Sequence, residues 1–213
     1  MNLLPDHFLG YRRCDGSVGV RNHLAVVSTV ALTNRWAELV AGSTALLVSG
    51  EFIRGLRAAD AVRQDQVILA LATHPNVGAC LVLCHDASSA RLWRERLATS
   101  GRPHEVLALM EQQGMRAALA AGRTALASLE KEREQAQRVP CPVSALTVAL
   151  ECGGSDPTSA LVANPAIGRV VDALIGAGGK ALLHRLPGHV GRGLRCGRGG
   201  RCRGHGGHEN EGG

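Results

Sequence analysis

Arg21 and Asn22 are the first residues whose types and position suit the binding of a small acid. They follow the segment Phe8–Val20 and stand directly before an apolar run that begins at Leu24. An arginine can hold a carboxylate through two parallel hydrogen bonds, and an asparagine can hold a hydroxyl group. The same pattern fits a plain hairpin with Asp15-Gly16 as its tight turn and an arginine paired with a local acid. Spacing alone leaves both interpretations open.

A second candidate site lies in the segment Leu150–Ser159, where an apolar strand runs into a glycine pair and a helix start. Asp156 suits the helix N-cap and Pro157 the first helical position. Free backbone N–H groups at a helix start attract anions, so we expect the turn Gly153–Pro157 to bind a carboxylate. Cys152 at the strand end can ligate a metal as a thiolate. The alternative is an ordinary capped turn with a buried cysteine.

The remaining histidines and cysteines give weaker signals. His74, in a loop before an apolar run, is more often a loop residue than a ligand, and we expect Cys80 and Cys84 to lie in the core. Near the C-terminus, two cysteines and two histidines could in principle bind zinc: Cys196, Cys202, His205 and His208. Their spacing matches no zinc module, and no apolar residues surround them to form a small core. Glycine–arginine repeats there would attract RNA by charge alone. Because charge alone is a weak signal, we do not expect nucleic acid as a partner.

The candidate residues lie within or beside six short apolar runs of the sequence. They show no alternation of apolar and polar residues, which is typical of strands buried on both faces of a parallel sheet. The predicted strands are Leu24–Val30, Thr44–Val48, Val77–Leu83, Glu105–Leu109, Ser144–Leu150 and Lys180–Leu183.

Helical segments separate these strands. They are predicted over Thr33–Ala41, Ala58–Ala72, Ser88–Ser100, Met115–Arg138 and Pro165–Ala177. Alternation of strand and helix predicts an α/β fold with a mostly parallel sheet, flanking helices and right-handed crossovers.

Composition limits the classes of protein. Aromatic residues make up only 2% of the chain, which argues against lectins and against platforms that stack nucleic acid bases. No apolar run reaches the roughly 18 residues of a membrane helix, and Met1–Gly10 does not resemble a secretion signal. The seven cysteines are scattered and odd in number, which favours reduced thiols. We therefore expect a cytoplasmic protein without a membrane partner.

We expect three segments. Residues 1–139 form a first α/β unit, and residues 140–183 form a strand–helix–strand unit after a joint marked by Pro140 and Pro142. Residues 184–213 hold eleven of the 27 glycines, six arginines and two acids, and so account for +4 of the net charge of +6. A segment this poor in apolar residues is expected to be disordered. Its composition changes at a single residue boundary, which we interpret as a possible reading-frame artefact.

Two ordered motifs carry a family resemblance. Phe8–Asn22 followed by Thr29-Val30 resembles the opening signature of the catalytic region of altronate and galactarate dehydratases. His74–Val77 resembles the family's entry to its next strand. The family's second signature is resembled by Cys152–Asp156 with Ala163–Gly168, followed by Asp172 and Gly178-Gly179. The large subunit of sulfolactate sulfo-lyase shares the first pattern.

The resemblance implies a hydro-lyase that removes water from a sugar acid or related hydroxy acid by β-elimination. It implies a divalent metal, iron(II), as cofactor, and a small partner subunit or a homo-oligomer. The catalytic residues carried over are Arg21, Asn22 and Asp156, with Cys152 as a metal ligand. The residues carried over for substrate binding are Gly153, Gly154, Ser155 and Asn164. The alternative is a non-catalytic, truncated relative that binds an acid ligand or a partner subunit.

The chain departs from the family pattern at positions where metal ligands are expected. Leu32 stands where the family has a cysteine, and Ser49–Ile53 stands where the family has a His-x-x-Gly-Cys motif. A Gly-Cys-Glu-like element appears as Cys84–Ala87. The family's C-terminal half does not follow. We therefore expect this chain alone to have little or no dehydratase activity.

Overall fold

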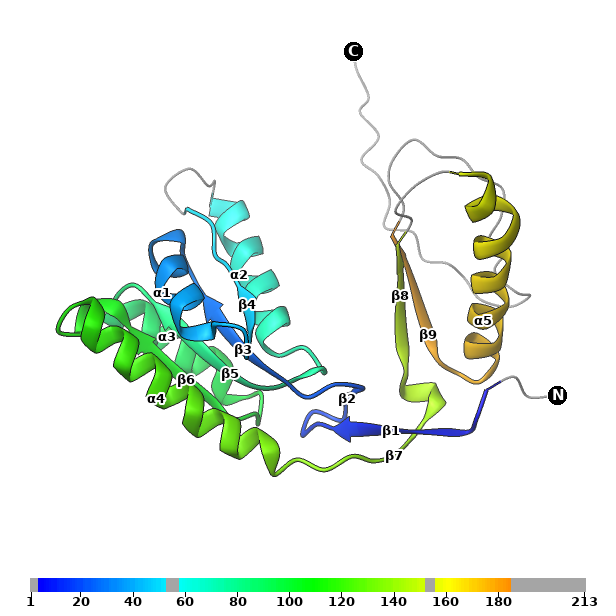
Figure 1. Cartoon of the computed structure of the whole chain (residues 1–213), viewed down its shortest axis with the longest axis horizontal. Coiled ribbons are helices and arrows are strands. Elements are labelled where there is room, and N and C mark those ends of the chain that lie inside the picture. The colour runs from blue at the N-terminus through cyan, green and yellow to red at the C-terminus, as the bar shows by residue number, and fades with distance from the viewer. Residues whose placement is uncertain (1–3, 53–57, 152–155, 185–213) are drawn as a thin grey trace, which may run out of the picture. The chain divides into compact units, whose positions relative to one another are not determined.

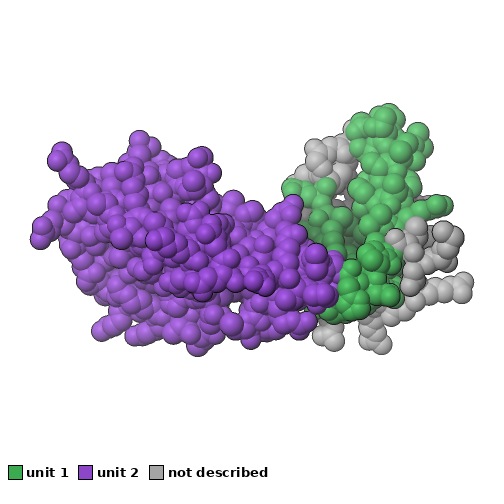
Figure 2. Space-filling model, turned by 60° about the horizontal axis from the view of Figure 1, so that its bottom comes forward, with its two compact units in different colours: residues 1–7, 142–213 green, residues 8–141 purple. Residues whose placement is uncertain are grey.

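A computed structural model describes residues 4–52, 58–151 and 156–184 of the chain. It divides into two compact units, which Figure 2 shows in different colours. The unit called first in the text is Phe8–Cys141, unit 2 (purple) in Figure 2, and the unit called second joins Met1–His7 to Pro142–Gly213, unit 1 (green) there. The predicted sites at Cys152–Ser155 and in the tail after His184 lie outside the described residues.

The first unit is built on a four-stranded parallel sheet in the order β4-β3-β5-β6. The strands are β3 (His23–Ser28), β4 (Leu46–Val48), β5 (Val77–Cys84) and β6 (His104–Ala108). All eight residues of β5 are buried, because helices cover both faces of the sheet. This explains why the strand reads as an unbroken apolar run.

Four helices complete three layers (Figure 1). Core residues from α1 (Ala31–Ala41) and α4 (Met115–Glu134) pack with one set of strand residues, which includes Leu24 and Val26. Core residues from α2 (Ala58–Ala72) and α3 (Ala87–Ala98) pack with the alternate set, which includes Ala25 and Val27. The predicted α/β class with a parallel sheet is confirmed.

The contact between α1 and α4 depends on Trp36. Its ring is fully buried, and its Nε1 donates a hydrogen bond of 2.9 Å to the carbonyl oxygen of Ala118. Gly122 lets the helices approach closely, because a Cβ atom at that position would lie 2.7 Å from Cγ2 of Val40. Helix α4 is predicted from the sequence to end at Arg138. It ends at Glu134, where the chain turns toward the next strand.

The Phe8–Asn22 segment forms a hairpin beside this sheet. Strand β1 (His7–Arg12) pairs antiparallel with β2 (Val18–Gly19), and β7 (Val139–Pro142) neighbours β1 in the same small sheet. Gly16 has a φ of 81°, a left-handed conformation that favours glycine, and its N–H donates to the carbonyl oxygen of Arg13. The hairpin with Asp15-Gly16 in its turn is confirmed, whereas the other part of that interpretation, an ion pair between Arg21 and a local acid, is not seen among the described residues.

The second unit contains a strand–helix–strand segment. Strand β8 (Thr147–Glu151) pairs in parallel with β9 (Lys180–His184), and α5 (Asn164–Gly176) connects them after a π-helical turn over Ser159–Ala163. The first strand begins three residues later than predicted, because Val143–Ala145 forms a 3₁₀ turn.

One helical stretch of the second unit reaches the length of a membrane helix, although polar and charged residues interrupt its apolar sequence. Ser159–Gly176 is long and apolar enough to cross a bilayer by length and composition alone, and only 6% of it is buried. It carries Arg169 and Asp172, and charged side chains inside a bilayer are costly. We therefore interpret the stretch as a helix with an exposed apolar surface rather than as a membrane span.

Candidate functional site

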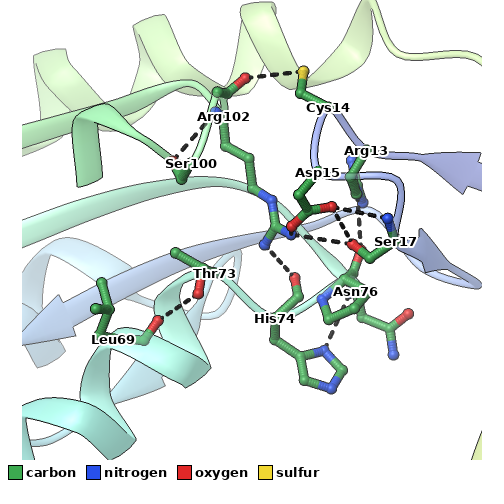
Figure 3. Close-up of polar contacts among 12 residues, drawn as sticks. Arg13, Cys14, Asp15, Ser17, Leu69, Thr73, His74, Asn76, Ser100 and Arg102 are labelled. Atoms are coloured by element: carbon green, nitrogen blue, oxygen red, sulfur yellow. Dashed lines mark hydrogen bonds and ion pairs between the residues drawn. The ribbon is translucent and has the colours of Figure 1, made fainter. Parts of the chain in front are cut away.

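The candidate site lies where the hairpin meets the loops that enter β5 and β6. These loops lie at the amino ends of the parallel strands and contain His74–Asn76 and Arg102 (Figure 3). The hairpin and the two loops are far apart in sequence, and arginine and asparagine side chains bind them together. Three sets of contacts define the site.

Arg13 makes the first set. Its Nε donates to the carbonyl oxygen of Pro75 at 2.8 Å, its Nη1 to Oδ1 of Asn22 at 3.0 Å, and its Nη2 to the carbonyl oxygen of Arg21 at 3.1 Å. Partial burial lowers the pKa of Arg13, and the neighbouring charge of Arg102 adds to this effect. A guanidinium ion still suits this position, because all three acceptors are oxygen atoms.

Asn76 makes the second set. Its Oδ1 accepts hydrogen bonds from the backbone N–H groups of Val20, at 2.8 Å, and Arg21, at 3.1 Å. The N–H of Asn76 donates in turn to Nδ1 of His74 at 3.1 Å, which shapes the loop. Partial burial lowers the pKa of His74, followed by the charge of Arg102, and this favours the neutral ring that the hydrogen bond requires. His74 therefore acts as a loop residue.

Arg102 makes the third set. Its side chain is only 4% exposed, and its Nη2 contacts Oδ2 of Asp15 at 3.0 Å, while Asp15 itself is 46% exposed. Its Nη1 donates to the carbonyl oxygen of His74 at 2.8 Å, and its Nε is buried without a hydrogen-bond partner among the described residues. Hydrogen bonds from Ser17 lower the pKa of Asp15, and Arg102 contributes further. Arg102 thus joins the hairpin turn to the entry of β6.

Asn22 is occupied by these contacts. Its Oδ1 accepts from Arg13, and its Nδ2 donates to the carbonyl oxygen of Arg133 at 2.9 Å. Arg133 returns a hydrogen bond of 3.2 Å from Nη1 to the carbonyl oxygen of Asn22. Both ends of the amide are therefore bound within the protein, so in this conformation Asn22 holds α4 against the start of β3.

Arg21 differs from its neighbours. It is exposed, and its guanidinium has no hydrogen bond or ion pair to any other residue in the described part of the chain. Its backbone is held on both sides, because its N–H donates to Asn76 and its carbonyl oxygen accepts from Arg13. Arg138 also donates to the carbonyl oxygen of Val20 at 3.3 Å. The structure therefore holds the backbone at residue 21 and presents a cation that has no partner among residues 4–52, 58–151 and 156–184.

The second signature is described only in part. Asp156 caps the helical stretch that begins at Pro157: its Oδ1 accepts from the N–H groups of Thr158, at 2.8 Å, and Ser159, at 2.9 Å. Hydrogen bonds from Ser159 and Thr158 lower the pKa of Asp156. Two amides of this helix start thus already bind a carboxylate of the protein. Asn164 is exposed at the start of α5.

The described residues do not fit a metal centre. No group of three or more His, Cys, Asp or Glu side chains lies close enough to hold a metal ion in residues 4–52, 58–151 and 156–184. The departures from the family pattern are Leu32, the described part of Ser49–Ile53, and Cys84–Ala87, which lie at or after the ends of β3, β4 and β5 and so share the carboxyl edge of the sheet. Open α/β sheets commonly bind ligands at that edge, near the point between β3 and β5 where the strand order reverses, whereas the contacts of Arg13, Asn76 and Arg102 gather at the amino edge.

The potential ligands at this edge serve the fold. Cys84 is fully buried, and burial raises the pKa of its thiol to about 11, which keeps it protonated. Hydrogen bonds from Ser88 and then Ser89 lower the pKa of Asp86 to about 2, because the carboxylate caps α3. Iron(II), which the resemblance implies, would need ligands outside the described residues, such as Cys152.

Two family models match this chain, and their boundary lies near the boundary between the two structural units. Residues 10–134 match the family model described as D-galactarate dehydratase/altronate hydrolase, second domain. Residues 143–193 match D-galactarate/altronate dehydratase, C-terminal, and this match extends past the start of the predicted tail at residue 184. A doubly wound α/β unit and a strand–helix–strand unit are thus the parts of one kind of protein. The chain belongs to the D-galactarate dehydratase/altronate hydrolase family, whose named members include dehydratases of sugar acids.

Individual relatives are similar over most of the chain. Altronate dehydratase of Bacillus subtilis is 30% identical over 192 residues, which cover 84% of this chain and 39% of that protein. The (2R)-sulfolactate sulfo-lyase subunit beta of Chromohalobacter salexigens is 32% identical over 176 residues, 82% of this chain and 45% of that protein. The chain therefore spans less than half of the length of either relative.

Proposed function

We propose that this chain is part of a hydro-lyase that removes water from a sugar acid or a related hydroxy acid by β-elimination. We further propose that its own contribution is to bind the carboxylate of that acid through Arg21. The observation that carries the second proposal is the contrast at residue 21 between a backbone fixed by Asn76 and Arg13 and an exposed guanidinium that pairs with no other described residue.

A guanidinium ion at this position has a clear chemical use. In β-elimination, a proton leaves the carbon next to the carboxylate, and negative charge spreads onto the carboxylate oxygens. Two parallel hydrogen bonds from an arginine bind the acid in the ground state and stabilise this charge as it develops. A donor that is held in place before the reaction stabilises it best, because no free energy is spent on reorganisation. Of the two other residues carried over as catalytic, Asn22 would contribute by holding the chain around Arg21, and Asp156 by capping its own helix in the second unit.

Replacing Arg21 with glutamine should weaken the binding of galactarate to the purified chain by roughly tenfold to hundredfold, the range expected for hydrogen bonds to a charged group. Glutamine keeps a polar side chain with part of the aliphatic stem but removes the positive charge. Binding can be followed by NMR titration of the backbone amides at constant ionic strength.

The matched control for this variant is Arg12→Gln. Arg12 is an exposed arginine of the same hairpin, so the change removes an equal charge from nearly the same place. It should alter the affinity by less than about twofold, as expected for a screened surface charge. Equal losses in both variants would show that net charge, not Arg21, attracts the ligand. An unchanged affinity in Arg21→Gln would refute the assignment.

Turnover by this chain alone should be absent. A catalytic metal normally needs three protein ligands and an open position, which the described residues do not supply. The purified chain can be loaded with iron(II) without oxygen and assayed with altronate, galactarate and sulfolactate, while bound iron is measured separately. One tightly bound iron per chain, or sustained turnover of any of the three acids, would contradict the prediction.

A second candidate function is that of a non-catalytic relative that binds an acid or a partner subunit. The exposed apolar surface of the second unit favours it: Leu161 is 77% exposed, Val162 67% and Val170 60%. One relative is named as a subunit beta, which fits a protein that works beside another subunit. Turnover and iron content, measured with and without the remaining parts of the enzyme, separate this function from the first.

A further inference from the structure

The loop His74–Asn76 has no role in the proposed function so far, although its sequence stands out. Its three residues all contact the hairpin or support those contacts. Asn76 accepts from two hairpin amides, Pro75 accepts from Arg13, and His74 accepts from the N–H of Asn76 and from Arg102. Gly19 fits closely against the loop, because a Cβ atom there would lie 2.0 Å from the carbonyl oxygen of Pro75.

The geometry points to Asn76 as the positioning residue for Arg21, a role that rests on the function proposed above for Arg21. Asn76 does not contact the acid. Its Oδ1 accepts hydrogen bonds from the N–H groups of Val20 and of Arg21, which lies 55 residues earlier in the chain. These bonds fix the backbone from which the Arg21 side chain extends. The carbonyl side of the same residue is fixed by Arg13, which is anchored to the same loop through Pro75.

The fold needs such a residue at this point. Residues 20–22 connect β2 to β3, and none of them belongs to a strand, so sheet pairing does not hold their backbone. Side chains satisfy this backbone instead: the N–H and carbonyl groups of Val20 bond to Asn76 and Arg138, and those of Arg21 to Asn76 and Arg13. A connector held only by water would let the arginine sample many positions, and binding would then cost additional ordering entropy.

A double-mutant cycle with Asn76→Ala and Arg21→Gln tests the proposal. In the wild-type background, Asn76→Ala should weaken galactarate binding about fivefold, within the range of coupling energies between residues in one hydrogen-bond network. In the Arg21→Gln background, it should cause no further loss, because a positioning residue acts only through the group that it positions. An equal loss in both backgrounds would overturn the proposal, since Asn76 would then act independently of Arg21.

Asn34→Ala is the matched control. Asn34 also joins two distant segments through its side-chain amide: Nδ2 donates to the carbonyl oxygen of Gly50 at 3.0 Å, and Oδ1 accepts from the N–H of Gly50 at 3.1 Å. It does so at the opposite edge of the sheet. Its loss should lower the stability of the fold without changing the affinity for the acid. A loss of affinity equal to that of Asn76→Ala would show that the effect is a general one on the fold.

Amide hydrogen exchange gives a readout that does not depend on the ligand. The N–H groups of Val20 and Arg21 should be protected in the wild type, exposed in Asn76→Ala, and protected again in Asn76→Asp, which keeps an oxygen acceptor at the same place. If Arg21→Gln leaves binding unchanged while this exchange pattern holds, the proposed function fails and Asn76 remains only a structural residue. If exchange at these amides does not follow the substitutions at Asn76, the positioning role itself is wrong.

Discussion

Replacing Trp36 with alanine is expected to lower the free energy of unfolding of the first unit by about 4 kcal/mol, near the upper end of single substitutions. Trp36 is fully buried and packs in the core that α1 and α4 form on one face of the sheet. The substitution removes this apolar area from the core and leaves a cavity between elements that cannot close on each other. It also removes the hydrogen bond to Ala118. Urea unfolding, followed by the fluorescence of the remaining Trp93, measures the change.

The variant Trp36→Phe separates the two contributions. Phenylalanine retains most of the apolar area but cannot donate a hydrogen bond to the carbonyl oxygen of Ala118, so the loss should be about 1–2 kcal/mol. If Trp36→Ala costs less than about 1 kcal/mol, the helix contact described here does not stabilise the protein. The binding of galactarate should be the same in both variants as long as they are folded, because Trp36 packs in the core between α1 and α4 and its hydrogen bond among the described residues is to Ala118, not to the hairpin.

Gly19→Ala is the second substitution expected to have a large effect. The new Cβ atom would lie 2.0 Å from the oxygen and 2.6 Å from the carbon of the Pro75 carbonyl group, and a backbone cannot yield as a flexible side chain does. The hairpin must therefore move away from the loop, which breaks the hydrogen bonds of Arg13 and Asn76. We expect a loss of about 3 kcal/mol in unfolding free energy. Limited trypsin digestion should then cut the hairpin at its arginines much faster.

Gly176→Ala is the control for the same chemical change. Apart from its chain neighbours and its own helix backbone, no described residue has an atom within 4 Å of a Cβ atom placed at Gly176, and the residue ends α5 without a positive φ. Its effect should stay within about 0.5–1 kcal/mol, and it can be slightly stabilising, because alanine restricts the unfolded chain. Should Gly19→Ala behave like this control, the close approach of the hairpin to Pro75 would not exist in solution.

The sequence predicts the layered part of the fold well, because its signal is local. Burial on both faces makes β5 an unbroken apolar run, and the helices between strands show their own period. Errors occur at the ends of elements. The strand predicted from Thr44 begins at Leu46, and the one predicted from Ser144 begins at Thr147. Propensity changes little from one residue to the next there, and hydrogen bonds decide the boundary.

The candidate site is less predictable, because it is made by contacts between distant residues. Arg21 and Asn22 are adjacent and equally suited to bind an acid, yet Asn22 is bound to Arg133, 111 residues later, and Arg21 is not. Arg102 carries no sequence signal at all, since a buried arginine is recognised only from its partners. Asn76 lies in the His74–Val77 motif, in which the histidine is the residue type more often associated with a functional site. A loop asparagine two residues after a histidine, before a buried strand, is the signal that could have found it.

The contacts of the hairpin also determine when, during synthesis of the chain, its hydrogen bonds can form. Within this unit the hairpin is synthesised before its partners, which follow at residues 74–76, at Arg102, and last at Arg133 and Arg138. Until α4 has been synthesised, the earliest part of the unit therefore lacks some of the partners that fix it. The sheet of β3, β4 and β5 can assemble before that point, while the carbonyl groups of Val20 and Asn22 still lack their partners Arg138 and Arg133. The connector into β3 therefore acquires its last hydrogen bonds only when the chain beyond α4 has been made.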